Sequence, residues 1–222
     1  MTIEEAIQQR HSVRSYIDKP IESALEEALR ALVATCNQES GLNIQLVTND
    51  PKAFDSRLAH YGKFSSVSNY FAMIGRPSER FDETVGYYGE RLVLEAQRLG
   101  LNTCWVGLTY KKNPDVLTIN EGEKLRCVIS LGYGTTPGVT RKTKSFEKVT
   151  KVEGLVPEWF KKGVDAALLA PTAMNQQKFT FILKSGNRVT AKAGWGFYSK
   201  VDLGIVKYHF EAAAGKEHFT WE

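Results

Sequence analysis

Helical and strand-like hydrophobic patterns mix irregularly along the chain, and this mixture is the feature that most restricts its fold. The clearest helix is predicted over 82–99, where apolar residues recur every three or four positions and Gly100 follows as a stop signal. The clearest strands are 179–184 and 188–193, which a Ser-Gly-Asn turn joins as a hairpin. Because the elements follow no strict strand–helix–strand order, the pattern predicts an α+β fold rather than a parallel α/β sheet.

Shorter signals predict the remaining elements. Thr2 and Glu5 form a capping-box pair for a short first helix, and Asp202 is predicted to cap the last helix, which ends at Gly215. The other helices are predicted to begin near Ser23 and Pro157, and the other strands to cover 43–50, 70–75 and 127–134.

Two pairs of stretches repeat one order of elements. Members of the first pair contain helix, polar kink, strand and turn, and members of the second place an amphipathic helix before a glycine. The pairs are 28–50 with 165–187, and 86–102 with 201–217. Their shared residues are few, and two helix–strand units can look alike without a repeat. Because the order agrees, we predict one domain over 1–222 with pseudo-repeated halves of about 1–150 and 151–222.

Composition excludes several classes of protein. A chain of 222 residues with 42% hydrophobic and 24% charged residues is large enough to bury a core and is not typical of disordered proteins. No apolar run approaches the roughly 18 residues that span a bilayer, and the acidic, helical N-terminus is unlike a signal peptide. Cys36, Cys104 and Cys127 lie far apart without a CxxC pair, so we expect reduced thiols in a cytoplasmic protein.

The net charge of +4 comes from one segment. Residues 141–151 contain five basic residues and one acidic residue, which equals the excess of the whole chain. Nucleic-acid-binding domains usually spread basic residues over a whole face. A single basic stretch therefore suits a small anion, such as a phosphate, at least as well as an acidic macromolecule.

Familiar catalytic motifs are absent from the sequence. There is no GxSxG, HExxH, P-loop or DxDxDG loop, and the glycine-rich segments 132–138 and 194–199 lack the third glycine of a dinucleotide fingerprint. Four histidines occur without metal-ligand spacing: His11, His60, His209 and His218. No nucleophile–base pair is recognisable, so we expect a cofactor to supply any demanding chemistry.

The segment RHSVRSY (10–16) concentrates polar side chains at the end of the first predicted helix. In an extended segment Arg10, Ser12 and Arg14 alternate and point to one side. Two guanidinium groups and a hydroxyl suit a phosphate, because arginine donates bidentate, charge-assisted hydrogen bonds to its oxygens. The alternative is a solvated helix end with surface arginines, which this fragment taken alone favours slightly.

Two further segments offer groups for a planar ligand. APTAMNQQKFTF (170–181) places amide side chains at a helix–strand junction, where they can hydrogen-bond a heterocycle. GLNTCWVGLTY (100–110) carries Gly107, whose missing side chain lets a flat ligand approach the backbone. The alternatives are a helix stop with turn-forming polar residues, which is the commoner case, and a helix-to-loop transition with a buried Trp105.

Together these segments resemble the FMN-dependent nitroreductase family. That family has R-[RH]-S-x-[RK]-x-[FY] after a short first helix, which RHSVRSY matches, and G-L-x-[TS]-x-W-x-G, which GLNTCWVG (100–107) matches. Its L-G-Y segment, basic stretch and A-P-S-x-x-N-x-Q motif are similar to SLGYG (130–134), RKTKSFEKV (141–149) and APTAMNQQKF (170–179). The resemblance spans nearly the whole chain and implies a nitroreductase-like α+β fold, with a central, mostly antiparallel sheet flanked by helices.

The position of the last motif departs from the usual family pattern. In typical members it follows the second helix, where this chain has ATCNQESGLNIQ (34–45), a poor match. In the usual homodimer, the two motifs that line one flavin come from different subunits. This sequence is therefore similar to a branch with both halves fused in one chain, which favours a monomer over a homodimer. Thr35, Asn37 and Asn43 are not expected to form a second flavin site.

The resemblance also implies a role for each matched segment. Arg10 and Ser12 would hold the FMN phosphate. Lys142 or Lys144 would help, since the phosphate carries close to two negative charges. Arg14 would lie near the pyrimidine edge of the flavin, where a fixed cation favours the reduced state. The remaining implied contacts are His11 in the same segment, the backbone N–H groups of Val106 and Gly107 facing flavin N5, and Pro171, Thr172, Ala173, Asn175 and Gln177 from the second half.

The implied activity is a ping-pong reaction. NAD(P)H would pass a hydride to flavin N5, and an electron-poor acceptor such as a nitroaromatic or quinone would then be reduced, so no side chain is predicted to be catalytic. The alternatives are a flavin-binding or storage protein, other flavin chemistry without NAD(P)H turnover, and a basic-loop binder of anions or nucleic acid. Five aromatic residues are candidates for the acceptor pocket, although such residues are more often core: Tyr16, Phe64, Tyr70, Trp195 and Phe197.

Overall fold

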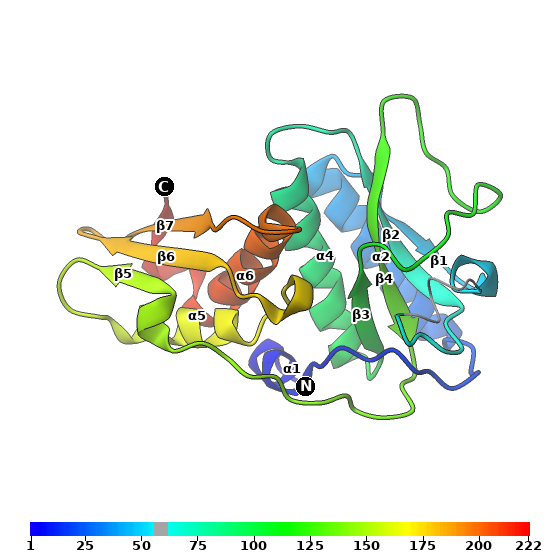
Figure 1. Cartoon of the computed structure of the whole chain (residues 1–222), viewed down its shortest axis with the longest axis horizontal. Helices are drawn as coiled ribbons and strands as arrows, with labels where there is room; N and C mark the ends of the chain where they lie inside the picture. The colour runs from blue at the N-terminus through cyan, green and yellow to red at the C-terminus, as the bar shows by residue number, and fades with distance from the viewer. Residues whose placement is uncertain (56–61) are drawn as a thin grey trace. The chain divides into compact units, whose positions relative to one another are not determined.

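The computed structural model describes residues 1–55 and 62–222 and divides the chain into two compact units (Figure 1). Unit 1 consists of Met1–Gln8, Asp82–Arg91 and Arg141–Glu222. Unit 2 consists of Gln9–Phe81 and Leu92–Thr140. Each unit is assembled from separate stretches of the chain, and the predicted pseudo-repeated halves stay a prediction.

Unit 2 is built on a four-stranded antiparallel sheet in the order β1–β2–β4–β3. The strands are β1 (Gln45–Val47), β2 (Asn69–Gly75), β3 (Asn102–Val106) and β4 (Lys124–Gly132). Ser130 of β4 lies opposite Tyr70 on one side and opposite Cys104 on the other. Because directly opposite residues share a face of the sheet, this register gathers the three side chains on one face.

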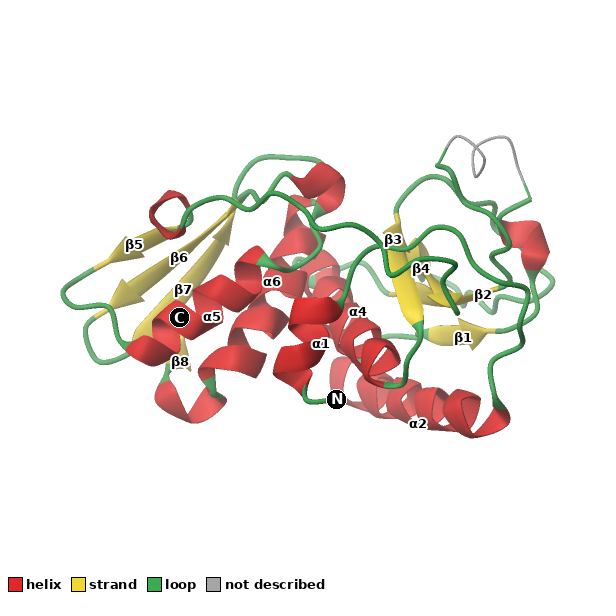
Figure 2. Cartoon of the chain, turned by 90° about the horizontal axis from the view of Figure 1, so that it is seen from below, coloured by secondary structure: helices red, strands yellow, loops and turns green. Residues whose placement is uncertain are grey.

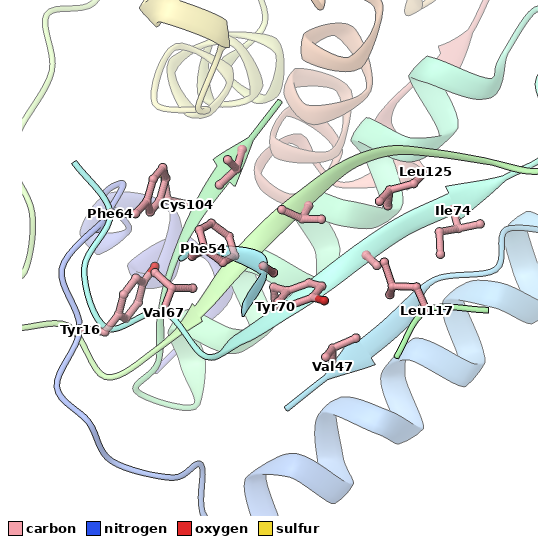
Figure 3. Packing of buried hydrophobic residues seen from close by; sticks show 14 of the residues in the cluster. Tyr16, Val47, Phe54, Phe64, Val67, Tyr70, Ile74, Cys104, Leu117 and Leu125 are labelled. Atoms are coloured by element: carbon pink, nitrogen blue, oxygen red, sulfur yellow. The ribbon is translucent and has the colours of Figure 1, made fainter. Parts of the chain in front are cut away.

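A hydrophobic cluster covers that face (Figure 3). Alternate residues of β2 enter it, namely Tyr70, Ala72 and Ile74, as the two-residue period of a strand requires. Phe54 and Phe64 pack over them from the connection between β1 and β2, with ring centroids 5.3 Å apart. The neutral core and the polar Ser130 therefore share one surface of the sheet.

Two α-helices of the described residues complete unit 2. Helix α2 (Ser23–Ser40) buries Leu29, Val33 and Cys36, and it ends at Gly41, whose left-handed φ of 71° suits glycine. Helix α4 (Phe81–Arg98) supplies its second part to this unit, and Gly100 follows it with a φ of 81°. Both helices lie where the sequence predicted them. None of the described helices has the length and apolar character to cross a membrane.

Unit 1 contains a second four-stranded sheet in the order β5–β6–β7–β8. The strands are β5 (Thr150–Val152), β6 (Phe179–Lys184), β7 (Arg188–Ala193) and β8 (Thr220–Trp221). The β6–β7 hairpin is antiparallel and has the predicted bounds, whereas β5 and β8 pair in parallel with β6 and β7. The predicted sheet is thus divided in two, and the first is wholly antiparallel.

Helices α5 (Glu158–Leu168) and α6 (Ser199–Ala214) pack together beside this sheet (Figure 2). Phe181 of β6 stacks on Phe210 of α6 with ring centroids 4.6 Å apart, and Phe160 and Trp221 join the same aromatic core. Most of α1 (Ile3–Gln9) and the first part of α4 also belong to unit 1.

Besides the Gly100 stop signal, two more of the predicted helix-end signals are confirmed and one is wrong. The backbone N–H of Glu5 donates to Thr2 Oγ1 at 3.1 Å, and the N–H of Thr2 donates to Glu5 Oε2 at 2.7 Å, which is the reciprocal capping box. Helix α6 ends at Gly215 as predicted. The prediction that Asp202 caps α6 is wrong, because α6 begins at Ser199 and the carboxylate bonds to a different loop.

Helices α4 and α6 approach each other closely at glycines within unit 1. A Cβ on Gly204 would overlap the carbonyl oxygen of Glu83 and lie 2.6 Å from the N atom of Tyr87. A Cβ on Gly86 would meet the carbonyl oxygen of Val201 in the same way. This contact requires glycine because the backbones leave no room for a methyl group.

We expect Gly204→Ala to lower the free energy of unfolding by about 2 kcal/mol, since overpacking a close contact forces the helices apart. The sign of the change in the free energy of unfolding is informative, because an unhindered glycine-to-alanine change inside a helix raises stability by about 1 kcal/mol. Urea unfolding of both proteins measures the difference. A more stable variant would show that the helices do not meet at this glycine.

Candidate functional site

The segment 10–16 of unit 2 is extended and lies beside β3, as its alternating pattern predicted. Ser12 forms a parallel bridge with Thr103, and the N–H of Val13 donates to the Thr103 carbonyl at 3.0 Å. Further along, the N–H of Tyr16 donates to the Ser65 carbonyl at 3.2 Å. The backbone of this segment is therefore fixed on the sheet rather than solvated at a helix end.

Tyr16 anchors the segment through its hydroxyl. The group donates to the Val13 carbonyl at 2.6 Å and lies 2.8 Å from Ser130 Oγ. Burial raises the pKa of Tyr16, as does the neighbouring Cys104, and these effects exceed the lowering by Ser130 and Arg14. The phenol thus stays neutral and keeps its proton for this bond.

Three of the residues predicted to bind the flavin affect the ionisation of one thiol, that of Cys104. Burial is the largest influence on the Cys104 thiol and raises its pKa. The charge of Arg14, a hydrogen bond from Ser12 and the charge of Arg10 each act in the opposite direction. All three side chains are therefore close enough to Cys104 to affect its ionisation, and the neutral thiol does not cancel their positive charge.

The two arginines differ in exposure. Arg10 is only 2% exposed, which is rare for a guanidinium group. Arg14 is exposed, and its guanidinium carbon lies 5.9 Å from the ring centroid of Phe64. One cation is thus fixed inside unit 2, while the other stays accessible on an aromatic ring.

The other predicted residues of unit 2 take varied positions. Val106 is the buried last residue of β3, and Gly107 follows it. The Nδ1 atom of His11 lies 2.8 Å from the Gln9 carbonyl.

The aromatic candidates for an acceptor pocket separate into three kinds. Tyr16 and Tyr70 are core residues at 4% and 1% exposure. Phe64 lines a cavity of about 330 Å³ in unit 2. Trp195 and Phe197 of unit 1 are 95% and 52% exposed. Phe64 thus borders a cavity, whose other lining residues are Pro51, Phe54, Asp55, Ser65, Ser66 and Val67.

Four predicted residues of unit 1 form one hydrogen-bonded cluster. Lys144 donates its backbone N–H to Gln177 Oε1 at 2.8 Å and its ammonium to the Gln177 carbonyl at 2.7 Å. Gln177 Nε2 and Asn175 Nδ2 both donate to the Lys142 carbonyl at 2.9 Å. The basic stretch is therefore tied to the loop 172–177, a connection that the sequence did not predict.

The loop 172–177 has an unusual backbone. Met174, Asn175 and Gln177 have φ values of 53°, 52° and 45°, in the left-handed region that residues with a Cβ rarely adopt. Pro171 before it is buried, and the Thr172 hydroxyl accepts the N–H of Gln177 at 3.1 Å. Strained backbone of this kind is concentrated at functional sites.

The three polar residues of the first half that are not expected to bind a flavin form hydrogen bonds within unit 2. Asn37 bonds both to the N–H and to the carbonyl of Ile44, at 2.7 and 2.9 Å. Thr35 donates to the Ala31 carbonyl within α2, and Asn43 donates to Glu123. These side chains brace α2 and β1.

The comparisons with known proteins establish the family. A family model described as "Putative TM nitroreductase" matches residues 2–214, so the chain belongs to this nitroreductase family. A putative nitroreductase from Thermotoga maritima is similar in structure, with a TM-score of 0.68 and 23% identity over 96% of this chain and 83% of that chain. The predicted family and nitroreductase-like fold are confirmed.

Two further solved structures are similar. A putative nitroreductase from Desulfovibrio desulfuricans, in complex with FMN, has a TM-score of 0.52 and 18% identity over 70% of this chain and 98% of that chain. A putative NADH dehydrogenase/NAD(P)H nitroreductase from Parabacteroides distasonis has a TM-score of 0.52 and 21% identity, with coverage of 66% and 95%. No curated protein matches the chain.

The part of the chain that the structure describes contains no group of side chains that could form a metal centre. Within residues 1–55 and 62–222, no three His, Cys, Asp or Glu side chains are placed to hold a metal ion. His209 is buried, with its Nε2 atom 2.8 Å from Glu90 Oε1. His60 lies outside the described residues.

We expect Tyr16→Phe to lower the free energy of unfolding by about 2 kcal/mol, because it leaves a buried carbonyl and a buried hydroxyl without their shared partner. Chemical denaturation measures this loss. Combining it with Ser130→Ala should cost less than the sum of the single changes, since both remove the same bond. Fully additive effects would contradict a Tyr16–Ser130 interaction.

Proposed function

We propose that this nitroreductase-family chain is an FMN-dependent oxidoreductase, which takes electrons from NADH or NADPH and reduces an electron-poor acceptor such as a nitroaromatic or quinone. The observation that carries the proposal is that β3 holds the segment 10–16 in an extended conformation, which places Arg10, Ser12 and Arg14 at alternate positions. The FMN complex of the Desulfovibrio desulfuricans relative supports it. The predicted monomer is part of the same proposal.

The donor set of unit 2 fits the phosphate of FMN. A phosphate ester with close to two negative charges needs cationic and hydroxyl donors. Arg10 and Ser12 provide one of each, and β3 holds the segment that carries them. Arg10 is only 2% exposed, so its guanidinium is held in place inside unit 2.

When bound, FMN supplies a ring system that accepts and returns a hydride, which the side chains of this chain cannot do. The protein's part is to bind FMN and to adjust the charge around its ring system. Arg14 is proposed to stabilise the negative charge that reduction places on the flavin pyrimidine, and the backbone N–H groups at Val106 and Gly107 are proposed to face the hydride-accepting atom. His11 is proposed to contact FMN only as a neighbour of Arg10 and Ser12, since its Nδ1 atom lies 2.8 Å from the Gln9 carbonyl.

The predicted contacts in unit 1 are proposed as a separate contribution. Asn175 and Gln177 already use their amide groups on Lys142, so this loop is proposed to act through its backbone and Thr172. The Lys144 ammonium is bound to a carbonyl. Lys142 is therefore the better of the two lysines of unit 1 for binding an anion, and Pro171 and Ala173 are proposed to contact a flavin.

We expect Arg10→Met to weaken FMN binding by about 10- to 100-fold, since one charge-assisted interaction with phosphate contributes roughly 1.5–3 kcal/mol. Titration of the protein with FMN, followed by flavin fluorescence, measures the dissociation constant. Riboflavin, which has no phosphate, provides the internal control and should bind both proteins equally.

The matched control is Arg76→Met, which removes an exposed arginine of the same unit. This variant should bind FMN like the unmodified protein. Equal FMN affinity in Arg10→Met would remove Arg10 from the phosphate site, and an equal loss for riboflavin would indicate general damage to the fold.

The electron donor is tested by visible absorption under anaerobic conditions. We expect the FMN-loaded protein to lose its flavin absorption on addition of NADH or NADPH and to regain it with a nitroaromatic or quinone. A flavin spectrum that neither nucleotide changes would indicate a storage protein or another donor. Absence of any flavin binding would refute the proposed function.

A further inference from the structure

A buried carboxylate holds the loop 172–177 of unit 1. Asp202 lies in the first turn of α6 and is 3% exposed. Its Oδ1 atom accepts the N–H of Ala173 at 2.9 Å, and its Oδ2 atom accepts Gln176 Nε2 at 2.7 Å. Each carboxylate oxygen therefore binds a different residue of the loop.

The loop needs such support because its backbone is unfavourable by itself. Three of its residues have left-handed φ angles, and none of them is glycine. Gln177, only 3% exposed, fastens the far end of the loop to the basic stretch. Asp202 binds Ala173 near the start of the loop and Gln176 next to Gln177, so the residues between these attachments are held from both sides.

We propose that Asp202 is a positioning residue, whose ionised carboxylate fixes the loop 172–177 in the conformation that binds FMN. This inference rests on the proposed function. Both of its contacts are N–H donors, so two acceptor oxygens are required. Protonation turns one oxygen into a hydroxyl, which leaves one of the donors without its acceptor.

The surroundings of Asp202 make this ionisation sensitive to pH. Burial raises its pKa from 3.8 to about 6, although the bonds from Ala173 and Gln176 oppose the rise. Charged groups on the elements packed against α6 include Glu83 of α4, whose Oε1 atom lies 2.6 Å from Lys207 Nζ, and Asp165 of α5, whose Oδ2 atom lies 2.7 Å from Lys161 Nζ. Lys200 lies on α6 itself, and Lys178 precedes β6. None of these is a cause of the shift, so burial sets it.

The raised pKa also has a consequence for stability. A carboxyl whose pKa is raised by folding stabilises the fold fully below its ordinary value of 3.8, and this contribution is lost as the pH rises through about 6. Near neutral pH, keeping Asp202 ionised therefore weakens the fold. A buried carboxylate that lowers stability while holding a strained loop fits a positioning role better than a purely structural one.

The first test uses hydrogen exchange of the FMN-free protein. Asp202→Asn resembles the protonated acid, because it keeps one acceptor and opposes the second donor with an amide. We expect the amides of 172–177 to exchange roughly tenfold faster in this variant near neutral pH, as expected for loss of one charged hydrogen bond. Asp165→Asn, an exposed change on α5, is the control and should leave the loop unchanged.

The second test measures FMN affinity at about pH 7.5 and about pH 5, on either side of the Asp202 pKa. The FMN phosphate also titrates near this range, so the informative quantity is the ratio of wild-type to variant affinity at each pH, in which that titration cancels. We expect Asp202→Asn to bind FMN roughly tenfold more weakly at the higher pH and equally at the lower one.

The outcomes separate the inference from the proposed function. Unchanged exchange in Asp202→Asn would overturn the positioning role, whether or not FMN binds. Faster exchange with unchanged FMN affinity, or an equal loss at both pH values, would also overturn it while leaving the proposed function intact. If the wild-type protein binds no FMN at either pH, the proposed function fails, and the exchange result still shows whether Asp202 holds the loop.

Discussion

The hydrogen bond between the Tyr16 hydroxyl and the Val13 carbonyl is the interaction on which the candidate phosphate site depends. It closes the extended segment 10–16 onto the sheet face that carries Ser130. The bond fixes the backbone between Val13 and Tyr16, and the bridge between Ser12 and Thr103 attaches the preceding residues to β3. Arg10, Ser12 and Arg14 each affect the ionisation of Cys104 in β3, so their influence depends on the register of this segment.

Buried charged groups occur in both units, and two of them lie beside predicted site residues. Arg10 is buried in unit 2 within the segment 10–16, and Asp202 is buried in unit 1 against the loop 172–177. Desolvating a charge weakens folding unless its partners offset the cost. The bonds from Ala173 and Gln176 lower the pKa of Asp202, but burial outweighs them. In the proposed function, Arg10 contacts the ligand directly and Asp202 acts through the loop that it holds.

Local patterns predicted the elements of this chain well and the contacts of its sites poorly. The hairpin 179–193 was predicted with its bounds because a two-residue period and a Ser-Gly-Asn turn are both local signals. Asp202 was assigned to a helix cap because an aspartate near a helix start fits that role locally. Its true partners lie 26 and 29 residues away, and Ser130 lies 114 residues from Tyr16. Such partners are fixed by tertiary packing, which no sequence window contains.

The two described sheets have the same number of strands but differ in topology. In unit 2 the strand after α4, β3, is separated from β2 by β4, and two antiparallel pairings make β3 parallel to β2. In unit 1 the strand after α6, β8, pairs directly with β7 in parallel, and β5 pairs in parallel with β6, whereas the described strand pairings of unit 2 are antiparallel. Ser130 of β4 lies 2.8 Å from the Tyr16 hydroxyl, which anchors the segment 10–16. This segment therefore depends on a strand between β2 and β3 that has no equivalent between β7 and β8 in the described sheet of unit 1.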